Sequence, residues 1–275
     1  MGTINILFCF DLNYYEKAIT TISQMLSVTN PANFYNIYII IDKIPSFSFN
    51  ELIEKVYKIK NYKILFRLQN HDFDNINSHK WSSVVFWRLQ VPSLIPEDKI
   101  LSFDVDIVFR EDPAILFSNE ISTHIAGVID LMSVEYLEYD KNKQYFSDIG
   151  KEKAVNYING GCILFNNKKI IRDRLYEKFL QEAKNNYALN EQHILNLVCS
   201  KTILDFIFSS FNNRVWYLRK KIFPHYAKNK KELKEKMNNV FYVHFNRPKQ
   251  WSYKWCFFNR DLKNEWNDLY KKIFN

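Results

Sequence analysis

Residues 100–109 read ILSFDVDIVF, an apolar run of strand type that two carboxylates, Asp104 and Asp106, interrupt. Side chains at positions i and i+2 of a strand lie on the same face, so both carboxylates are expected to point the same way. Two like charges in an apolar run are costly to bury, and a divalent cation would offset their repulsion. Such oxygen ligands suit Mg²⁺ or Mn²⁺, which would also bind a diphosphate. The stretch predicts a metal site at a strand end; the alternative is two carboxylates that cap the following turn.

A second Asp-x-Asp in the chain, Asp72 and Asp74, has the same spacing in a different context. It lies in a polar stretch, residues 71–79, with no strand-like run before it. We therefore predict a loop there. The apolar run before Asp104 is what favours a metal site at that position.

Strand-like and helix-like stretches alternate along the chain. Strands are expected at residues 4–10, 37–41, 63–68, 99–104, 124–129, 162–165 and 240–244, and helices at 18–26, 49–57, 81–89, 170–183 and 191–198. Residues 134–156 are polar and irregular, as is typical of a lid or binding loop. The order predicts an α/β fold with a mostly parallel central sheet flanked by helices, and such sheets bind ligands beyond the carboxyl ends of their strands.

The composition is that of an ordinary globular protein, with 47% hydrophobic and 25% charged residues in 275. These values exclude wholesale disorder. The four cysteines form no CxxC pair, no leader-like segment begins the sequence, and no apolar run approaches the ~20 residues that span a bilayer. We expect a cytoplasmic protein with reduced thiols.

The Asp104 and Asp106 pair belongs to a series of motifs that occur together in one known family. The motifs are FDLNY at 10–14, WRL at 87–89, DVD at 104–106, GVID at 127–130, NGGCILFN at 159–166, EQHIL at 191–195 and HFNRPKQW at 244–251. In this order the chain resembles the family 8 glycosyltransferases from residue 4 to about 251. It is most similar to the bacterial lipopolysaccharide and lipooligosaccharide galactosyl- and glucosyltransferases.

This resemblance implies a GT-A type nucleotide-diphosphosugar transferase fold. It also implies transfer of a hexose, from UDP-galactose or UDP-glucose, to a saccharide or glycolipid acceptor such as lipopolysaccharide, with retained configuration. The residues implied in holding Mn²⁺ or Mg²⁺ are Asp104, Asp106 and His244. Those implied in binding the UDP-sugar are Asp11, Asn13, Arg88, Asn159, Gly160, Gly161 and Lys249. The implied catalytic residues, which would meet the sugar, are Asp130 and Gln192.

The chain departs from the family pattern in its last motif, which is one residue shorter. Arg247 stands near the usual Gly, and Gln250 stands where Pro is usual. The family's Gly lets the backbone approach the diphosphate, so here we expect the side chains of Lys249 and Arg247 to meet phosphate instead. Glu191 replaces the usual Asp before Gln192.

Several of these residues also have a structural interpretation, which the sequence leaves open. Asn13 could cap the first helix. The pair Gly160 and Gly161 could be a plain turn into a strand. Gln192 could be a surface amide, and His244 a hydrogen-bonded residue at the end of a strand.

Two other functions stay open as alternatives. A different nucleotide-diphosphosugar enzyme, such as a nucleotidyltransferase, usually carries a Gly-rich basic first loop, which residues 10–13 lack. A non-catalytic protein could bind saccharide or RNA through a basic aromatic C-terminal stretch. No RNP-type or Gly-x-x-Gly motif is present, so we expect no nucleic-acid partner.

Positive charge concentrates toward the C-terminus. Residues 214–275 carry 16 Lys and Arg against 5 Asp and Glu, which favours an anionic partner. We divide the chain into a catalytic domain, residues 1–250, and a basic aromatic segment, residues 251–275. We expect this segment either to associate peripherally with an anionic membrane surface, at the inner face of the membrane, or to pack on the domain.

Overall fold

The computed structural model describes residues 2–74, 76, 82–130, 156–185, 190–204, 210–211, 231–232, 235, 240–245, 249–252 and 260–275. Two expectations lie almost wholly outside these residues: the lid or binding loop at 134–156, of which Asn156 alone is described, and the role of Arg247. The other site residues expected from sequence all lie within them.

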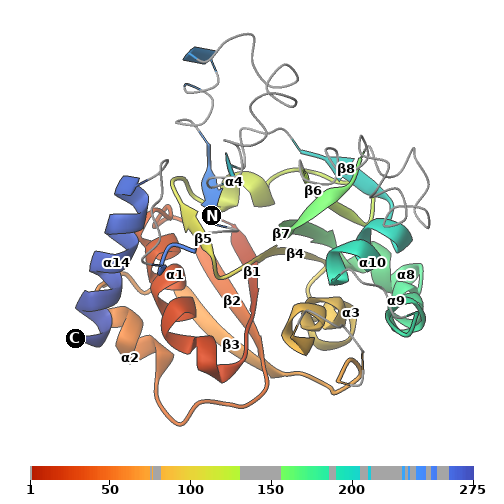
Figure 1. Cartoon of the computed structure of the whole chain (residues 1–275), viewed down its shortest axis with the longest axis horizontal. Helices are drawn as coiled ribbons and strands as arrows, with labels where there is room; N and C mark the ends of the chain where they lie inside the picture. The colour runs from red at the N-terminus through yellow and green to blue at the C-terminus, as the bar shows by residue number, and fades with distance from the viewer. Residues whose placement is uncertain are drawn as a thin grey trace.

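A seven-stranded sheet forms the centre of the molecule (Figure 1). Its order is β3 (Tyr62–Leu68), β2 (Phe34–Ile41), β1 (Thr3–Cys9), β4 (Lys99–Phe103), β7 (Ile158–Asn166), β6 (Ile125–Ile129) and β8 (Lys201–Ile203). Every neighbouring pair is parallel except the two that involve β7, which runs antiparallel to β4 and β6. The predicted mostly parallel sheet is therefore confirmed.

A second, three-stranded sheet lies beyond the carboxyl end of β4. Its order is β5 (Ile107–Phe109), β10 (Tyr242–His244) and β9 (Ser210–Phe211). β10 is antiparallel to β5 and parallel to β9. Because β5 follows β4 after three residues, this small sheet brings the late part of the chain to the edge of the large one.

Helices cover both faces of the large sheet. The α-helices are α1 (Tyr15–Ser27), α2 (Phe49–Glu54), α3 (Val91–Leu94), α4 (Ala114–Phe117), α8 (Asn167–Arg172), α9 (Leu175–Ala183), α10 (Glu191–Val198) and α14 (Arg260–Phe274), and the 3-10 helices are η1 (Leu12–Tyr14) and η2 (Ser83–Gln90). Strand β1 buries Ile6 and Phe8 in the hydrophobic cluster that contains α1, and Leu7 in the cluster that contains α9 and α10. A strand apolar on both faces is typical of a sheet covered on both sides.

Three local expectations are wrong. The helix expected at 81–89 is the 3-10 helix η2, and the single helix expected at 170–183 is two helices, α8 and α9. The break between them falls at Arg174, whose backbone is left-handed (φ 53°). The third concerns Asp104 and Asp106, which lie in the turn between β4 and β5 rather than on a strand.

The C-terminal helix α14 packs on α1 (Figure 1). Trp266 is 1% exposed, and its indole Nε1 donates to Thr21 Oγ1 at 3.1 Å. The Tyr270 hydroxyl donates to Glu16 Oε2 at 2.6 Å. The apolar stripe of α14 thus covers the domain, while membrane association of the basic face stays a prediction. Among the described residues, we find no helix with the length and apolar character needed to cross a bilayer.

Candidate active site

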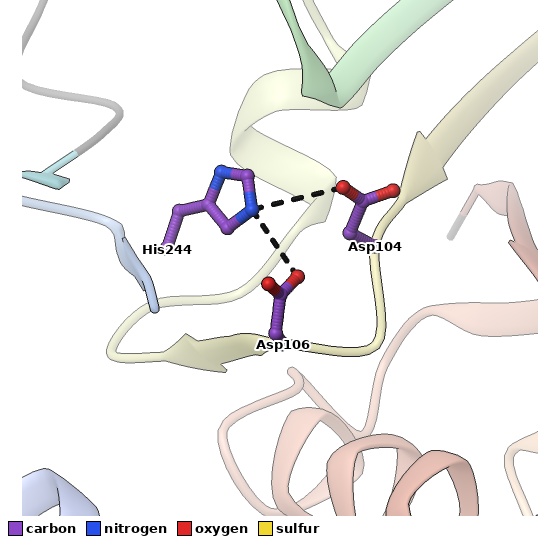
Figure 2. Close-up of side chains that lie close together, drawn as sticks. All are labelled: Asp104, Asp106 and His244. Carbon is purple, nitrogen blue, oxygen red and sulfur yellow. Dashed lines mark ion pairs between the residues drawn. The ribbon is translucent and has the colours of Figure 1, made fainter. Parts of the chain in front are cut away.

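The turn between β4 and β5 places Asp104 and Asp106 beside His244. Strand β10 pairs with β5 so that His244 lies opposite Ile107, the first residue after the turn. His244 Nε2 lies 3.1 Å from Asp106 Oδ1 and 3.6 Å from Asp104 Oδ2 (Figure 2). The backbone N–H of Phe245 donates to Asp106 O at 2.8 Å, which fixes the strand to the turn. Residues far apart in the sequence therefore meet at one point.

This arrangement fits a divalent cation. One ligand atom from each of Asp104, Asp106 and His244 can be chosen so that all lie within 4.8 Å of one another. Two carboxylates and an imidazole are a donor set suited to Mn²⁺. Gly161 makes room for the imidazole, because a Cβ at this position would overlap the His244 ring. Gly160 and Gly161 both lie within β7, so the interpretation of the pair as a plain turn before a strand is wrong, while their contact with the UDP-sugar stays a prediction.

Two cations stabilise the ionised carboxylates. Lys249 Nζ forms an ion pair with Asp106, and Arg88 forms one with Asp104. Burial opposes the ionisation of Asp106, but His244 and Lys249 outweigh it and hold the Asp106 pKa well below its usual range. Asp106 is therefore charged and able to bind a metal at neutral pH.

Arg88 is buried and joins the turn between β4 and β5 to β7 and α10. Its guanidinium donates to Gly160 O and pairs with Asp104, and its Nε lies 3.3 Å from Glu191 Oε1. Burial disfavours the charge on Arg88, but Asp104 and Glu191 more than compensate and raise its pKa above the usual value. Arg88 thus stays charged at every physiological pH and fixes the position of Asp104.

A second cluster is linked to Arg88 through Gly160, whose carbonyl accepts from Arg88 and whose N–H donates to Gln192. Gln192 Nε2 donates to Asp130 Oδ2 at 2.7 Å, and Asn159 Nδ2 donates to the same oxygen at 3.2 Å. Gln192 Oε1 in turn accepts the N–H of Gly160 at 2.6 Å. The amide of Gln192 is therefore held in one orientation, and the surface-amide alternative is wrong for this residue.

Asp11 and Asn13 lie after β1, at the same edge of the sheet. β1 and β4 are parallel neighbours with Phe8 opposite Phe103, so the segment after β1 is level with the turn that holds Asp104 and Asp106. Asp11 caps η1 by accepting the N–H of Asn13 at 2.9 Å. The N-cap position of α1 is Tyr14, and no side-chain bond caps that helix. The capping residue is thus Asp11 rather than Asn13, and nucleotide contact by either residue stays a prediction.

Sequence reasoning gave no role to two residues of this site. Glu191 is 4% exposed, and burial raises its pKa to about 7 even though Arg88 opposes the shift. The Cys9 thiol lies near the Arg88 charge, and burial raises its pKa to about 12, so it stays neutral. Glu191 could have been recognised as an acidic residue directly before Gln192, while the place of Cys9 depends on η2 packing over β1 and carries no sequence signal.

Comparison with solved structures identifies the architecture. WbbM, a bifunctional glycosyltransferase, matches 99% of this chain with a TM-score of 0.75 and 18% identity, and the match covers 50% of WbbM. The galactosyltransferase LgtC, in complex with donor and acceptor sugar analogues, matches 99% of the chain with a TM-score of 0.70 and 18% identity, over 97% of its own length. GlyE of Streptococcus pneumoniae matches 97% with a TM-score of 0.67 and 16% identity, over 60% of its length. The chain thus spans about half of WbbM and nearly all of LgtC, and the likeness gives the GT-A fold.

A search of curated proteins by sequence found no match. The family model described as "Glycosyl transferase family 8" matches residues 5–255. That match covers both β4 and β10 and hence every ligand of the candidate metal site. The chain therefore belongs to glycosyl transferase family 8 and is a glycosyltransferase with a GT-A fold.

Proposed function

We propose that this glycosyltransferase moves a hexose, galactose or glucose, from a UDP-sugar to a surface saccharide such as that of lipopolysaccharide, with retained configuration and in dependence on Mn²⁺ or Mg²⁺. The observation that carries the proposal is the convergence of Asp104, Asp106 and His244 at one point. Such a cluster can hold a divalent cation, and the cation would bind the diphosphate of the donor and stabilise it on release. LgtC, a galactosyltransferase of similar fold, supports a hexose donor.

The proposed division of labour follows from the contacts. Asp104, Asp106 and His244 hold the metal, which when bound supplies Lewis-acid charge for the departing diphosphate. Lys249 has a side chain that is 40% exposed, so its ammonium can reach a phosphate while Asp106 keeps it close. Arg88 is buried and forms ion pairs with Asp104 and Glu191, and its part is to position Asp104.

Gln192 acts in this proposal as a fixed dipole. Its Nε2 is bound to Asp130 and its Oε1 accepts from Gly160, so the amide cannot rotate without breaking two hydrogen bonds. A preorganised carbonyl of this kind can stabilise the oxocarbenium-like sugar, because positive charge develops there in the transition state. Asp130 anchors the amide and, together with Asn159, presents oxygen to the sugar.

The test is a donor screen that reports UDP release, with Mn²⁺ and with a chelator. We expect UDP-galactose or UDP-glucose to be consumed only with metal, and product NMR to show an α linkage from the α donor. Asp104→Asn or Asp106→Asn should abolish metal-dependent UDP binding by calorimetry, a loss of about 100-fold or more, while the protein stays folded.

The chain offers a matched control for these variants. Asp72→Asn with Asp74→Asn changes an Asp-x-Asp of the same spacing in an exposed loop, and UDP binding should not change. Full-strength UDP binding by the Asp104→Asn, Asp106→Asn double variant would rule out the assigned metal site. A β-linked product would rule out retention.

A further inference from the structure

The carbonyl of Val105, the residue between the two carboxylates, is held from two sides. Thr21 Oγ1 donates to Val105 O at 2.8 Å from helix α1. Gln250 Nε2 donates to the same oxygen at 3.1 Å from the segment that follows β10. Both donors are fully buried. A peptide oxygen with two buried donors has both lone pairs engaged, so the Val105–Asp106 peptide plane cannot turn freely.

Helix α14 reaches both donors. Trp266 Nε1 donates to Thr21 Oγ1 at 3.1 Å, so the Thr21 hydroxyl accepts from α14 and donates to the turn. Asn267 Nδ2 donates to the backbone oxygen of Gln250 at 3.2 Å. Trp266 therefore orients the Thr21 hydroxyl, and Asn267 holds the backbone of Gln250. Thr21 and Gln250 are the two residues that donate to Val105 O.

The segment that contains Gln250 contacts the turn twice. Lys249 pairs with Asp106, and the next residue donates to Val105. Gln250 is the position where the family usually has Pro, a residue whose side chain cannot donate a hydrogen bond. This amide is therefore a feature of this chain's own sequence, and it has a definite partner.

We propose that Thr21, Gln250 and Trp266 are positioning residues for the metal site, and we name this set the Val105 clamp. By fixing the Val105–Asp106 peptide, the clamp sets the direction in which the Asp106 side chain points from the backbone. The C-terminal helix is then part of the catalytic unit, since it orients the Thr21 hydroxyl. The effect on metal binding rests on the proposed metal role of Asp104 and Asp106. The fixing of the Val105–Asp106 peptide by the clamp does not.

The central variant is Thr21→Val, which removes the hydroxyl and keeps the shape. Its matched control is Thr20→Val, because Thr20 is equally buried on the same helix but bonds within it, to Glu16 O at 2.8 Å. We expect Thr21→Val to weaken Mn²⁺ binding in calorimetry about three- to tenfold, as loss of one buried hydrogen bond implies. Thr20→Val should bind Mn²⁺ like the wild type, and Thr21→Ser should restore binding.

Amide hydrogen exchange without metal gives a second readout. The Asp104 N–H donates to Gly161 O at 2.9 Å, and the Phe245 N–H donates to Asp106 O at 2.8 Å, so both amides report on the turn. Both should exchange about three- to tenfold faster in Thr21→Val than in Thr20→Val. Gln250→Met removes the other donor to Val105, and we expect the same two effects, which keeps the test available if Thr21→Val fails to fold.

The outcomes separate this proposal from the proposed function. Equal Mn²⁺ affinity and equal exchange in the Thr21 and Thr20 variants would overturn the clamp, because a merely structural hydroxyl lowers stability in both alike. If the wild type itself binds no Mn²⁺, the proposed metal role is wrong, and the exchange rates still decide whether the clamp exists.

Discussion

Glu191 shows at the residue scale how the fold alters the chemistry of a single side chain. Burial raises its pKa from 4.5 to about 7, so the folded protein holds a proton there that the unfolded chain releases. Below pH 4.5 the folded and unfolded chains are both protonated at Glu191, and the contribution of Glu191 to the free energy of unfolding is at its highest. As pH rises from 4.5 to about 7 this contribution is lost, because the unfolded chain is ionised there and must take up a proton to fold.

Glu191→Gln therefore flattens part of the pH profile of stability. Between pH 5 and pH 7.5 the wild type should lose on the order of 2–3 kcal/mol of unfolding free energy that the variant keeps. Urea denaturation at several pH values, without ligand, measures the difference between the two proteins. Parallel profiles would show that Glu191 is ionised throughout.

Gly161 carries a steric prediction at the same scale. Gly161→Ala places a methyl group against the His244 ring, so the imidazole must leave the two carboxylates. We expect Mn²⁺ binding in calorimetry to fall by about tenfold or more, because one of three ligands is displaced. Gly160→Ala is the control, since the nearest side-chain oxygens to its Cβ lie at 3.2 Å, and it should retain Mn²⁺ binding. Equal losses would contradict the role of the ring.

The three residues of the candidate metal site could be predicted from sequence, although the reason given for Asp104 and Asp106 was wrong. Asp104 and Asp106 were expected to share the face of a strand, and they meet because a turn bends around Val105. His244 was placed with them by resemblance and is brought there by β10 pairing with β5. The clamp residue Thr21 could not be predicted, because its helical spacing marks it only as one more buried position.

At the scale of elements, the strands were easier to predict than the short helices. β1, β2 and β3 are apolar runs whose pattern depends on local burial, and they appear close to their expected bounds. η2 and the break at Arg174 depend on tertiary contacts that override local propensity. The reversed direction of β7 has no signature in residue order, since an apolar strand reads alike in both directions.

Helix α14 supports a prediction about stability. Trp266→Ala removes a fully buried indole and should lower the free energy of unfolding by about 3–5 kcal/mol. Tyr270→Phe on the same helix keeps the ring and removes the hydrogen bond to Glu16, and it should cost about 1 kcal/mol. Chemical denaturation compares the two. A small loss in Trp266→Ala would mean that α14 does not contribute to the domain core.

At the scale of the whole molecule, positive charge lies on the exposed face of helix α14. Lys271 and Lys272 are exposed, while Ile273 next to them is buried. We propose that this basic end attracts an anionic membrane surface at the inner face of the membrane, the place where a glycolipid acceptor would be found.

Reversing these two charges tests that proposal without disturbing the core. Lys271→Glu with Lys272→Glu should weaken flotation with anionic liposomes about 30-fold or more, because each lysine contributes ~1 kcal/mol at such a surface. Lys168→Glu with Lys178→Glu, on α8 and α9, gives the same change of net charge elsewhere and should leave flotation nearly unchanged. Wild-type protein that ignores anionic liposomes would contradict the proposal.

The pairing of β10 with β5 has a consequence for biosynthesis. The ribosome adds Asp104 and Asp106 long before His244, and at about 5–20 residues per second the interval is roughly 7–28 s. Throughout that time the nascent chain presents the two carboxylates without the imidazole of His244. Capture of the proposed metal by all three side chains would therefore be a late step in the maturation of each molecule, and a chain stalled before residue 244 lacks one of the three proposed ligands.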